Sequence, residues 1–269
     1  MLVWLTGLAT YSLSPAVLWV CSDCAQIRRY DLTNTNSNFT TGTLFPTLLD
    51  SLINAVSLGL LIFTTTPVTG GHINPLITIS TFFGQLVTFP HAVAYILCQI
   101  IGATIATFLI HAMLSREHGF NDAIPGCWID PSAITAGEAV ILEMMICVTL
   151  IFIVYGASLN PWWGALYSPV VRPILIGLTL GLCTFVTAAL KPGYIGAGVH
   201  PARCFRLMAV EGRWHLHWVH WLGPVIAGAL NTAIHWTMPP GKLRKAWEHW
   251  EVWTSLLGCK YSLFNMLML

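Results

Sequence analysis

Two short stretches decide the fold: Gly70-Gly71-His72-Ile73-Asn74-Pro75-Leu76 and Gly196-Ala197-Gly198-Val199-His200-Pro201-Ala202-Arg203. They are imperfect copies of one motif, in which glycines precede a hydrogen-bonding side chain and then a proline. Proline suits the first helical position because it lacks an N–H that would be unpaired there, and the residue before it can cap the remaining donors. Each copy follows two long apolar stretches. This pattern predicts a duplicated fold with two broken elements, which is typical of a permeation site at the membrane midplane.

The composition of the chain is that of a membrane protein. Of its 269 residues, 55% are hydrophobic and only 9% are charged. A soluble domain usually carries about 25% charged residues, so most of this surface must face something other than water. A spanning helix needs about 20 mainly apolar residues. Six such stretches occur, near 2–25, 46–66, 89–113, 135–157, 172–190 and 217–237. We therefore expect an all-α, multi-pass membrane protein.

The charges give a weak signal of orientation. The net charge of +1 does not suggest a nucleic-acid partner. Lys242, Arg244 and Lys245 follow the last apolar stretch and favour a cytoplasmic C-terminus. Arg28 and Arg29 follow the first stretch and oppose that orientation, because an even number of spans would place them outside.

Asn38 begins the sequon Asn38-Phe39-Thr40 in the loop after the first span. The site could be glycosylated only if this loop lies outside. The alternative is a chance sequon that lies too close to the membrane to be used.

The two halves of the chain, about 1–115 and 130–237, are separated by a polar loop. Each half holds two spans, one copy of the motif with a short half-helix, and a third span. An odd number of spans per half forces the two copies into opposite orientations. We expect residues 1–237 to form one domain of inverted repeats and residues 238–269 to form a cytoplasmic tail.

The inverted halves predict where the two half-helices meet. They would enter from opposite faces and bring their N-termini together near the bilayer centre, each with about +0.5 of an elementary charge. Two positive ends exclude cations and orient a polar molecule so that its oxygen faces Asn74 and His200. Arg203 is costly in a membrane and by default faces a cavity. There it would repel cations and donate to passing oxygens.

Further motifs occur in a fixed order along the chain. They are Thr69-Gly70-Gly71-His72-Ile73-Asn74-Pro75, Gln99-x-x-Gly102-Ala103, Glu143 with an apolar run, Pro173-x-x-Ile176-Gly177, His200-Pro201-Ala202-Arg203 and His217-Trp218-Val219-His220-Trp221-x-Gly223-Pro224. On these motifs, over about 1–237, the chain resembles the aquaporin (major intrinsic protein) family. The resemblance implies six spans plus two half-helices, cytoplasmic termini, and a homotetramer with one pore per subunit. It also implies passage of water and small neutral solutes.

The resemblance assigns a selectivity filter to four positions: Asn54, Thr184, Ala197 and Arg203. Water-specific family members typically carry phenylalanine and histidine at the first two. The small polar residues here imply a wider constriction, which favours glycerol, urea or hydrogen peroxide in addition to water. Cys204 and Trp221 instead favour a water channel. Glycerol-conducting relatives usually carry aspartate at the position of Cys204, and Trp221 is the aromatic residue typical of water channels.

Two residues of the motifs depart from the family pattern, since Leu76 replaces alanine and His200 replaces the second asparagine. A neutral imidazole can donate one hydrogen bond to a solute, but histidine titrates near physiological pH. Burial beside two helix N-termini and Arg203 disfavours its charged form. We expect His200 to stay neutral and replace asparagine, and we take pH-dependent flux through His200 as a hypothesis. Leu76 and His200 also support an alternative, a non-conducting structural or junctional homologue with an occluded pore.

Glu143 would be expensive in a membrane without partners. We expect it to accept hydrogen bonds from buried backbone N–H groups of the second-half loop. The eight cysteines are not expected to form a disulfide framework, because Cys98, Cys147 and Cys183 lie in mid-span as small buried hydrophobes.

His215, His217 and His220 interleave with tryptophans, which predicts an interfacial aromatic belt rather than a metal site. We find no nucleophile–base pair, phosphate loop or paired carboxylates in the spans, so we expect no enzyme and no cofactor. We expect the plasma membrane, with an intracellular membrane as the alternative.

Overall fold

The computed structural model describes most of the membrane-embedded chain. The described residues are 44–114, 127–160, 164, 167–188, 190, 194, 196–212 and 214–237. The first expected span, the Asn38 sequon and the tail 238–269 lie outside them.

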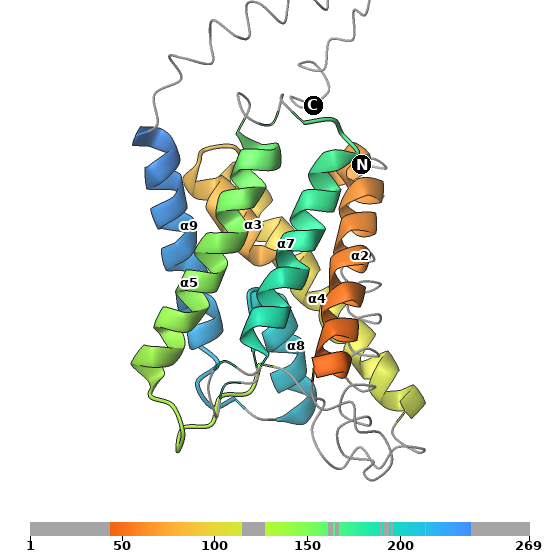
Figure 1. The fold of residues 1–269 in the computed structure, drawn as a ribbon, viewed down its shortest axis with the longest axis vertical. Helices are drawn as coiled ribbons and strands as arrows, with labels where there is room; N and C mark the ends of the chain where they lie inside the picture. Colours follow the sequence, from red (N-terminus) through yellow and green to blue (C-terminus); the bar gives the residue numbers. More distant parts are fainter. Residues whose placement is uncertain are drawn as a thin grey trace, which may run out of the picture.

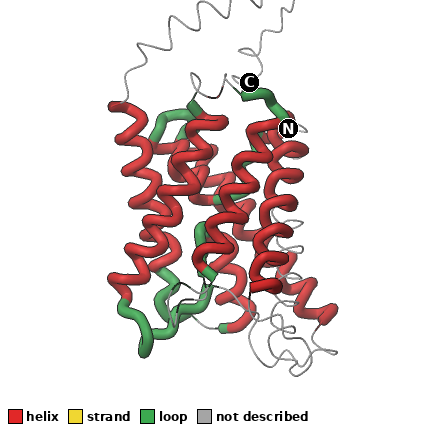
Figure 2. Tube along the Cα trace, viewed as in Figure 1, coloured by secondary structure: helices red, strands yellow, loops and turns green. Residues whose placement is uncertain are grey.

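Almost all of the described residues lie in helices (Figure 1, Figure 2). The helices are α2 (Leu44–Thr69), α3 (Pro75–Phe83), α4 (Phe89–Leu114), α5 (Ala136–Val154), the π-helical turn η1 (Tyr155–Leu159), α7 (Val171–Thr187), α8 (Pro201–Glu211) and α9 (Val219–Thr237). Three segments of the described chain are long and apolar enough to cross a membrane, namely Thr47–Thr69, Phe89–Leu109 and Ala136–Leu159. The helix Val171–Thr187 is a shorter apolar one. The expected all-α class is confirmed.

The short helices α3 and α8 lie in opposite halves of the bundle, α3 in the upper half and α8 in the lower half (Figure 1). Both begin at a proline. Asn74 caps α3 by accepting the Leu76 N–H, and His200 caps α8 by accepting the Arg203 N–H. The helix starts expected from the two sequence motifs are therefore confirmed.

Small residues bring α2 and α7 into close contact. A Cβ on Gly177 would lie 2.3 Å from the Ala55 carbonyl oxygen, and one on Gly181 would lie 2.7 Å from the Ser51 carbonyl oxygen. Small residues at such spacing let membrane helices approach through their backbones. This packing places Asn54 of α2 level with the middle of α7, between Gly177 and Gly181.

The apolar motif residues are in the centre of the core, while the outer faces of the bundle are apolar and exposed. Ile73, Leu76 and Val199 belong to one buried cluster. On the outside, Leu52 of α2 and Leu182 of α7 are each more than half exposed. A surface of this kind suits lipid or a neighbouring subunit.

Candidate channel site

The N-terminal ends of α3 and α8 meet inside the bundle. Asn74 Nδ2 donates to the Val199 carbonyl at 3.0 Å, and His200 Nε2 lies 2.8 Å from the Ile73 carbonyl oxygen. Both side chains are buried. The two positive helix ends therefore face each other, as the inverted halves predict.

The hydrogen bonds of His200 define its protonation. Nδ1 accepts the Arg203 N–H at 3.2 Å, so the ring proton belongs on Nε2, which faces the Ile73 carbonyl. A neutral imidazole has one N–H and one acceptor, so both nitrogens are used. In this arrangement the ring has no N–H left for a solute, in contrast to the expectation from the sequence. The reason is that an asparagine amide has two hydrogens and an imidazole has one.

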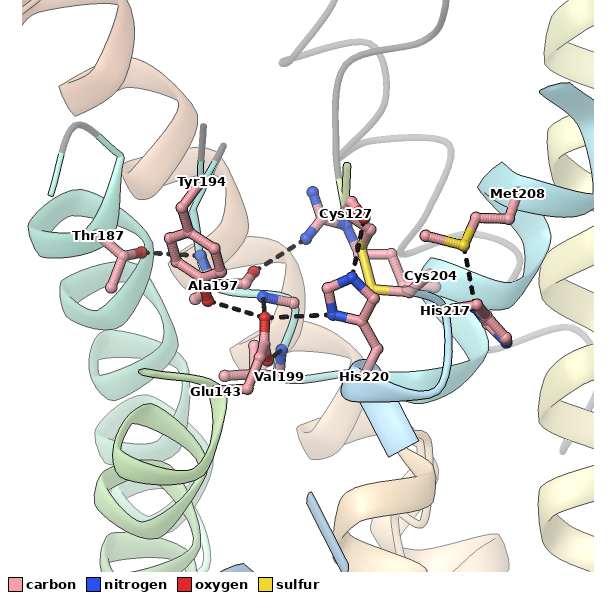
Figure 3. Close-up of polar contacts among 12 residues, drawn as sticks. Cys127, Glu143, Thr187, Tyr194, Ala197, Val199, Cys204, Met208, His217 and His220 are labelled. Carbon is pink, nitrogen blue, oxygen red and sulfur yellow. Dashed lines mark hydrogen bonds and ion pairs between the residues drawn. A yellow bond between two sulfur atoms is a disulfide. The ribbon is translucent and has the colours of Figure 1, made fainter. Parts of the chain in front are cut away.

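Two of the four expected filter residues are joined directly. Arg203 is buried, 7% exposed, and its Nη1 donates to the Ala197 carbonyl at 3.2 Å. The Ala197 N–H in turn donates to Thr187 Oγ1 at 2.9 Å (Figure 3). Thr184 is only half-buried and bonds its hydroxyl to the Gly181 carbonyl of its own helix. The α7 side chain that bonds to the filter loop, residues 196–200 before α8, is therefore Thr187, three residues beyond the expected Thr184.

Asn54, the remaining filter candidate, is oriented by Asp50. Asn54 Nδ2 lies 3.0 Å from both the carbonyl oxygen and Oδ1 of Asp50, and both residues are buried. Both acceptors face the amide nitrogen, so the amide oxygen of Asn54 points away from Asp50. A solute beside Asn54 would therefore meet an acceptor.

Glu143 lies beside the filter loop and is fully buried (Figure 3). Oε1 accepts the Gly198 N–H at 2.8 Å and the Tyr194 hydroxyl at 2.7 Å. Oε2 accepts the Val199 N–H at 3.1 Å. Val199 has φ of +40°, a conformation that is strained for a β-branched residue and persists only when its surroundings fix it. Glu143 and Asn74 hold its N–H and its carbonyl.

The loop before α3, residues 70–74, is held by a different side chain. Gln99 of α4 donates to the His72 carbonyl and, at 3.2 Å, to Thr78 Oγ1. The His72 ring stacks on Tyr95 with centroids 4.8 Å apart. One neutral amide thus holds this loop, whereas a carboxylate holds the loop of the second half.

A disulfide joins Cys127 to Cys204, so the expectation that the cysteines form no disulfide framework is wrong for this pair. The two residues are 77 positions apart, and nothing in their spacing indicates contact. Cys204 directly follows Arg203, so the loop before α5 is fastened beside the filter. Cys98, Cys147 and Cys183 are buried and take part in no disulfide among the described residues, as expected.

The expected interfacial belt does not include His220, so that part of the prediction is wrong. His215, Trp214 and Trp218 are exposed, but His220 is 1% exposed and lies between Cys127 and Glu143 (Figure 3). The reason is that α9 begins only at Val219. The first two histidines therefore precede the helix, and the third turns inward.

Arg206 is a second buried cation, which was not expected from the sequence. It is fully buried on α8, and its Nη1 donates to Thr107 Oγ1 of α4. It lies three residues, close to one helical turn, from Arg203. The positive charge at this end of α8 is therefore larger than Arg203 alone provides.

These features define a class of protein: a helical membrane channel in which two half-helices meet end to end at a buried polar centre. The sequence profile of the Major intrinsic protein family matches residues 17–235, and the chain belongs to this family. Its members are transmembrane channels for water or small solutes rather than enzymes, and they have the inverted-repeat fold.

Similar proteins agree with this assignment. "Probable aquaporin TIP3-2" of Arabidopsis thaliana is 30% identical over 199 residues, covering 72% of this chain and 69% of the relative. "Aquaporin TIP3-2" of Zea mays is 32% identical over 170 residues, covering 62% and 59%. The X-ray structure of the aquaglyceroporin from Plasmodium falciparum superposes with a TM-score of 0.69 at 15% identity, covering 86% of this chain and 95% of that one. The last comparison concerns the fold alone.

Proposed function

We propose that the protein is a passive channel that conducts water and small uncharged solutes, such as glycerol, urea or hydrogen peroxide, and excludes ions and protons. The observation that carries the proposal is the meeting of the two half-helix N-termini through Asn74 and His200. Both ends are positive, and Arg203 lies one turn from His200. A cation entering this region would meet the positive ends of both half-helices and the Arg203 guanidinium.

The chemistry of the filter candidates supports solutes larger than water. Asn54 offers an amide oxygen, because its nitrogen bonds to Asp50. Arg203 offers N–H donors on the other wall, and Ala197 adds little bulk. Glycerol, urea and peroxide each donate and accept hydrogen bonds. A wall with both functions therefore compensates them for the water they lose on entry.

Leu76 bears on the non-conducting alternative. Its side chain is fully buried in the central apolar cluster with Ala202 and Val199. This position supports packing between the half-helices rather than a plug in the lumen. The conducting channel is therefore the function we propose, and the occluded homologue is the outcome that would contradict it.

The disulfide supports an orientation. Disulfides persist in oxidising compartments, so the end of the bundle that carries Cys127 and Cys204 should face away from the cytoplasm. α9 starts near this end, and its 19 residues extend roughly 28 Å. The basic residues after α9, Lys242 and Arg244, then lie on the cytoplasmic side. We propose cytoplasmic termini, the plasma membrane as the location, and a homotetramer whose contacts use the apolar outer faces of the bundle.

The test is solute uptake into proteoliposomes that contain the purified protein. Stopped-flow light scattering would follow volume changes under gradients of glycerol and urea, and a lumenal dye would report hydrogen peroxide. The proposal predicts uptake of at least one of these solutes above that of protein-free vesicles, with no change in ion conductance. Uptake equal to that of protein-free vesicles for all three would contradict the solute breadth proposed here.

A further inference from the structure

We infer that Asp50 is a specificity-determining residue of this channel. It holds the Asn54 amide with its oxygen toward the aqueous path, so that the α2 wall favours solutes that carry N–H2 groups, such as urea. The inference rests on the proposed function and names the solute class that this wall serves best. Asp50 acts through Asn54 and is therefore a positioning residue.

Asp50 is a buried acidic residue inside a membrane-spanning segment. It belongs to the apolar span Thr47–Thr69, and its side chain is buried. An ionisable residue within a span is costly and marks a functional site by default. An apolar residue would avoid this cost, so we expect Asp50 to serve a polar group close to it.

The polar group closest to Asp50 along α2 is Asn54, one helical turn away. Asp50, Asn54 and Leu58 follow one another at four-residue spacing, and all three are buried. Leu52 and Val56, on the outer face of the same helix, are exposed. Residues four apart are neighbours on a helix surface. The two polar side chains therefore share the face of α2 that is turned into the bundle.

Asp50 takes both hydrogens of the Asn54 amide group. Asn54 Nδ2 lies 3.0 Å from the carbonyl oxygen of Asp50 and 3.0 Å from Asp50 Oδ1. An amide nitrogen carries two hydrogens and does not accept, so each of these oxygens receives one of them. The amide nitrogen of Asn54 then has no hydrogen left for a solute.

The amide oxygen of Asn54 is the atom that remains for a solute. In the described part of the chain, the hydrogen bonds of the Asn54 side chain are those of its nitrogen. Buried polar atoms in native proteins are nearly always hydrogen-bonded to protein or to water. Water or a solute with an N–H or O–H group would supply the missing donor at this oxygen.

The side chain of Asp50, rather than its backbone, leaves this wall with an acceptor alone. The backbone carbonyl receives one N–H of Asn54 and could do so with any residue at position 50. The second N–H would then be available to the path. Because Asp50 Oδ1 receives this second hydrogen, the wall presents an oxygen and no donor.

A wall that only accepts hydrogen bonds distinguishes amides from alcohols. The N–H2 group of urea can only donate, whereas a hydroxyl group of glycerol rotates and can either donate or accept. Urea therefore gains when no N–H of the wall faces it, while glycerol finds a partner on either kind of wall. Asp50 thus raises the permeability of urea relative to that of glycerol.

The experiment measures the ratio of urea to glycerol permeability in proteoliposomes that contain the full chain, by stopped-flow light scattering. Asp50→Leu replaces the carboxyl group by an apolar side chain of similar size and frees one N–H of Asn54. We expect the ratio to fall by about threefold to tenfold, the effect of losing one hydrogen bond. Both solutes are measured on the same vesicles, so the amount of folded protein cancels in the ratio.

Asp130→Leu is the matched control, because it makes the same change outside the spans. The Asp130 carboxylate lies in the loop before α5 and accepts from the backbone N–H and the hydroxyl of Ser132 in its own turn. The control should keep the ratio of the unmodified protein. An equal fall in Asp130→Leu and Asp50→Leu would overturn the inference.

Asp50→Asn keeps the inference testable if Asp50→Leu fails to fold, because it preserves the shape of the side chain. Asparagine at this position can donate to Asn54 Oδ1 and turn the Asn54 N–H2 group toward the path. The ratio should again fall, by at least about twofold. A ratio equal to that of the unmodified protein in either folded variant would overturn the inference.

The unmodified protein separates this inference from the proposed function. Passage of glycerol or hydrogen peroxide without any passage of urea would overturn the inference and leave the channel function standing. Absence of uptake of all three solutes would contradict the proposed function instead.

Discussion

Asn74 and His200 occupy equivalent positions at the starts of the two half-helices, and each lies within hydrogen-bond distance of the carbonyl that precedes the other. They differ in the number of N–H donors that remain available to a solute. Asn74 Nδ2 has a second hydrogen beyond the one given to Val199, whereas the single N–H of His200 faces Ile73. The centre of the path therefore offers one side-chain donor where a pair of asparagines would offer two.

His200→Asn tests this difference. The change restores a second amide hydrogen, which would lower the barrier for water by about 1 kcal/mol, the usual worth of one hydrogen bond. Water permeability should therefore rise by about fivefold, measured by stopped-flow swelling. The dependence of flux on pH should keep the shape it has in the unmodified protein, because His200 is neutral in the structure. A profile that becomes flat in His200→Asn would show that His200 titrates and would contradict the hydrogen bonding described here.

Asn54→Phe tests the assignment of Asn54 to the filter. The ring would replace a small amide beside the middle of α7 and remove the acceptor that Asp50 orients. Glycerol and urea uptake should fall by at least about tenfold, equivalent to 1.4 kcal/mol, while water flux stays within about threefold. Leu52→Phe is the control, because Leu52 is exposed on the outer face of α2. Unchanged glycerol uptake in Asn54→Phe would remove Asn54 from the filter.

Glu143→Gln tests the support behind the filter loop. The amide would turn an N–H2 group toward the N–H of either Gly198 or Val199, and one of these buried donors would lose its acceptor. Leaving a buried donor unpaired costs about 1–3 kcal/mol, so we expect a clear fall in thermal stability in detergent. Glu138→Gln is the matched change, because Glu138 belongs to an exposed capping box at the start of α5. Its cost should be about 1 kcal/mol or less, and similar losses in the two variants would argue against the role of Glu143.

Replacing Cys127 and Cys204 by serine tests the disulfide. The loss should cost about 2–4 kcal/mol of stability. Both cysteines are buried, so in the unmodified protein reduction followed by denaturation should give two more maleimide-reactive thiols than denaturation alone. In the double variant, reduction should add no maleimide-reactive thiols. Labelling of both thiols without prior reduction would show that the disulfide is absent.

The parts of the structure that the sequence predicts are local. The starts of α3 and α8 follow from a cap and a proline, which are adjacent residues. Glu143 could be singled out because a carboxylate in mid-span is costly wherever it lies. Each inference needed only the residue and its immediate context.

The parts that the sequence did not predict depend on contacts between distant segments. Cys127 and Cys204 meet only because the loop before α5 folds onto α8. His220 was assigned to a surface belt because its neighbours in sequence are exposed tryptophans, but the start of α9 at Val219 turns it inward. For His200 the position was predictable, yet the use of both ring nitrogens depends on Ile73 in the other half.

The most direct test of the central claim is the osmotic water permeability of proteoliposomes and its temperature dependence. If the two half-helix ends face a continuous aqueous path, the vesicles should swell much faster than protein-free ones. The activation energy should then be close to that of water diffusing in bulk. Swelling at the rate of protein-free vesicles, with the high activation energy of passage through lipid, would contradict the account.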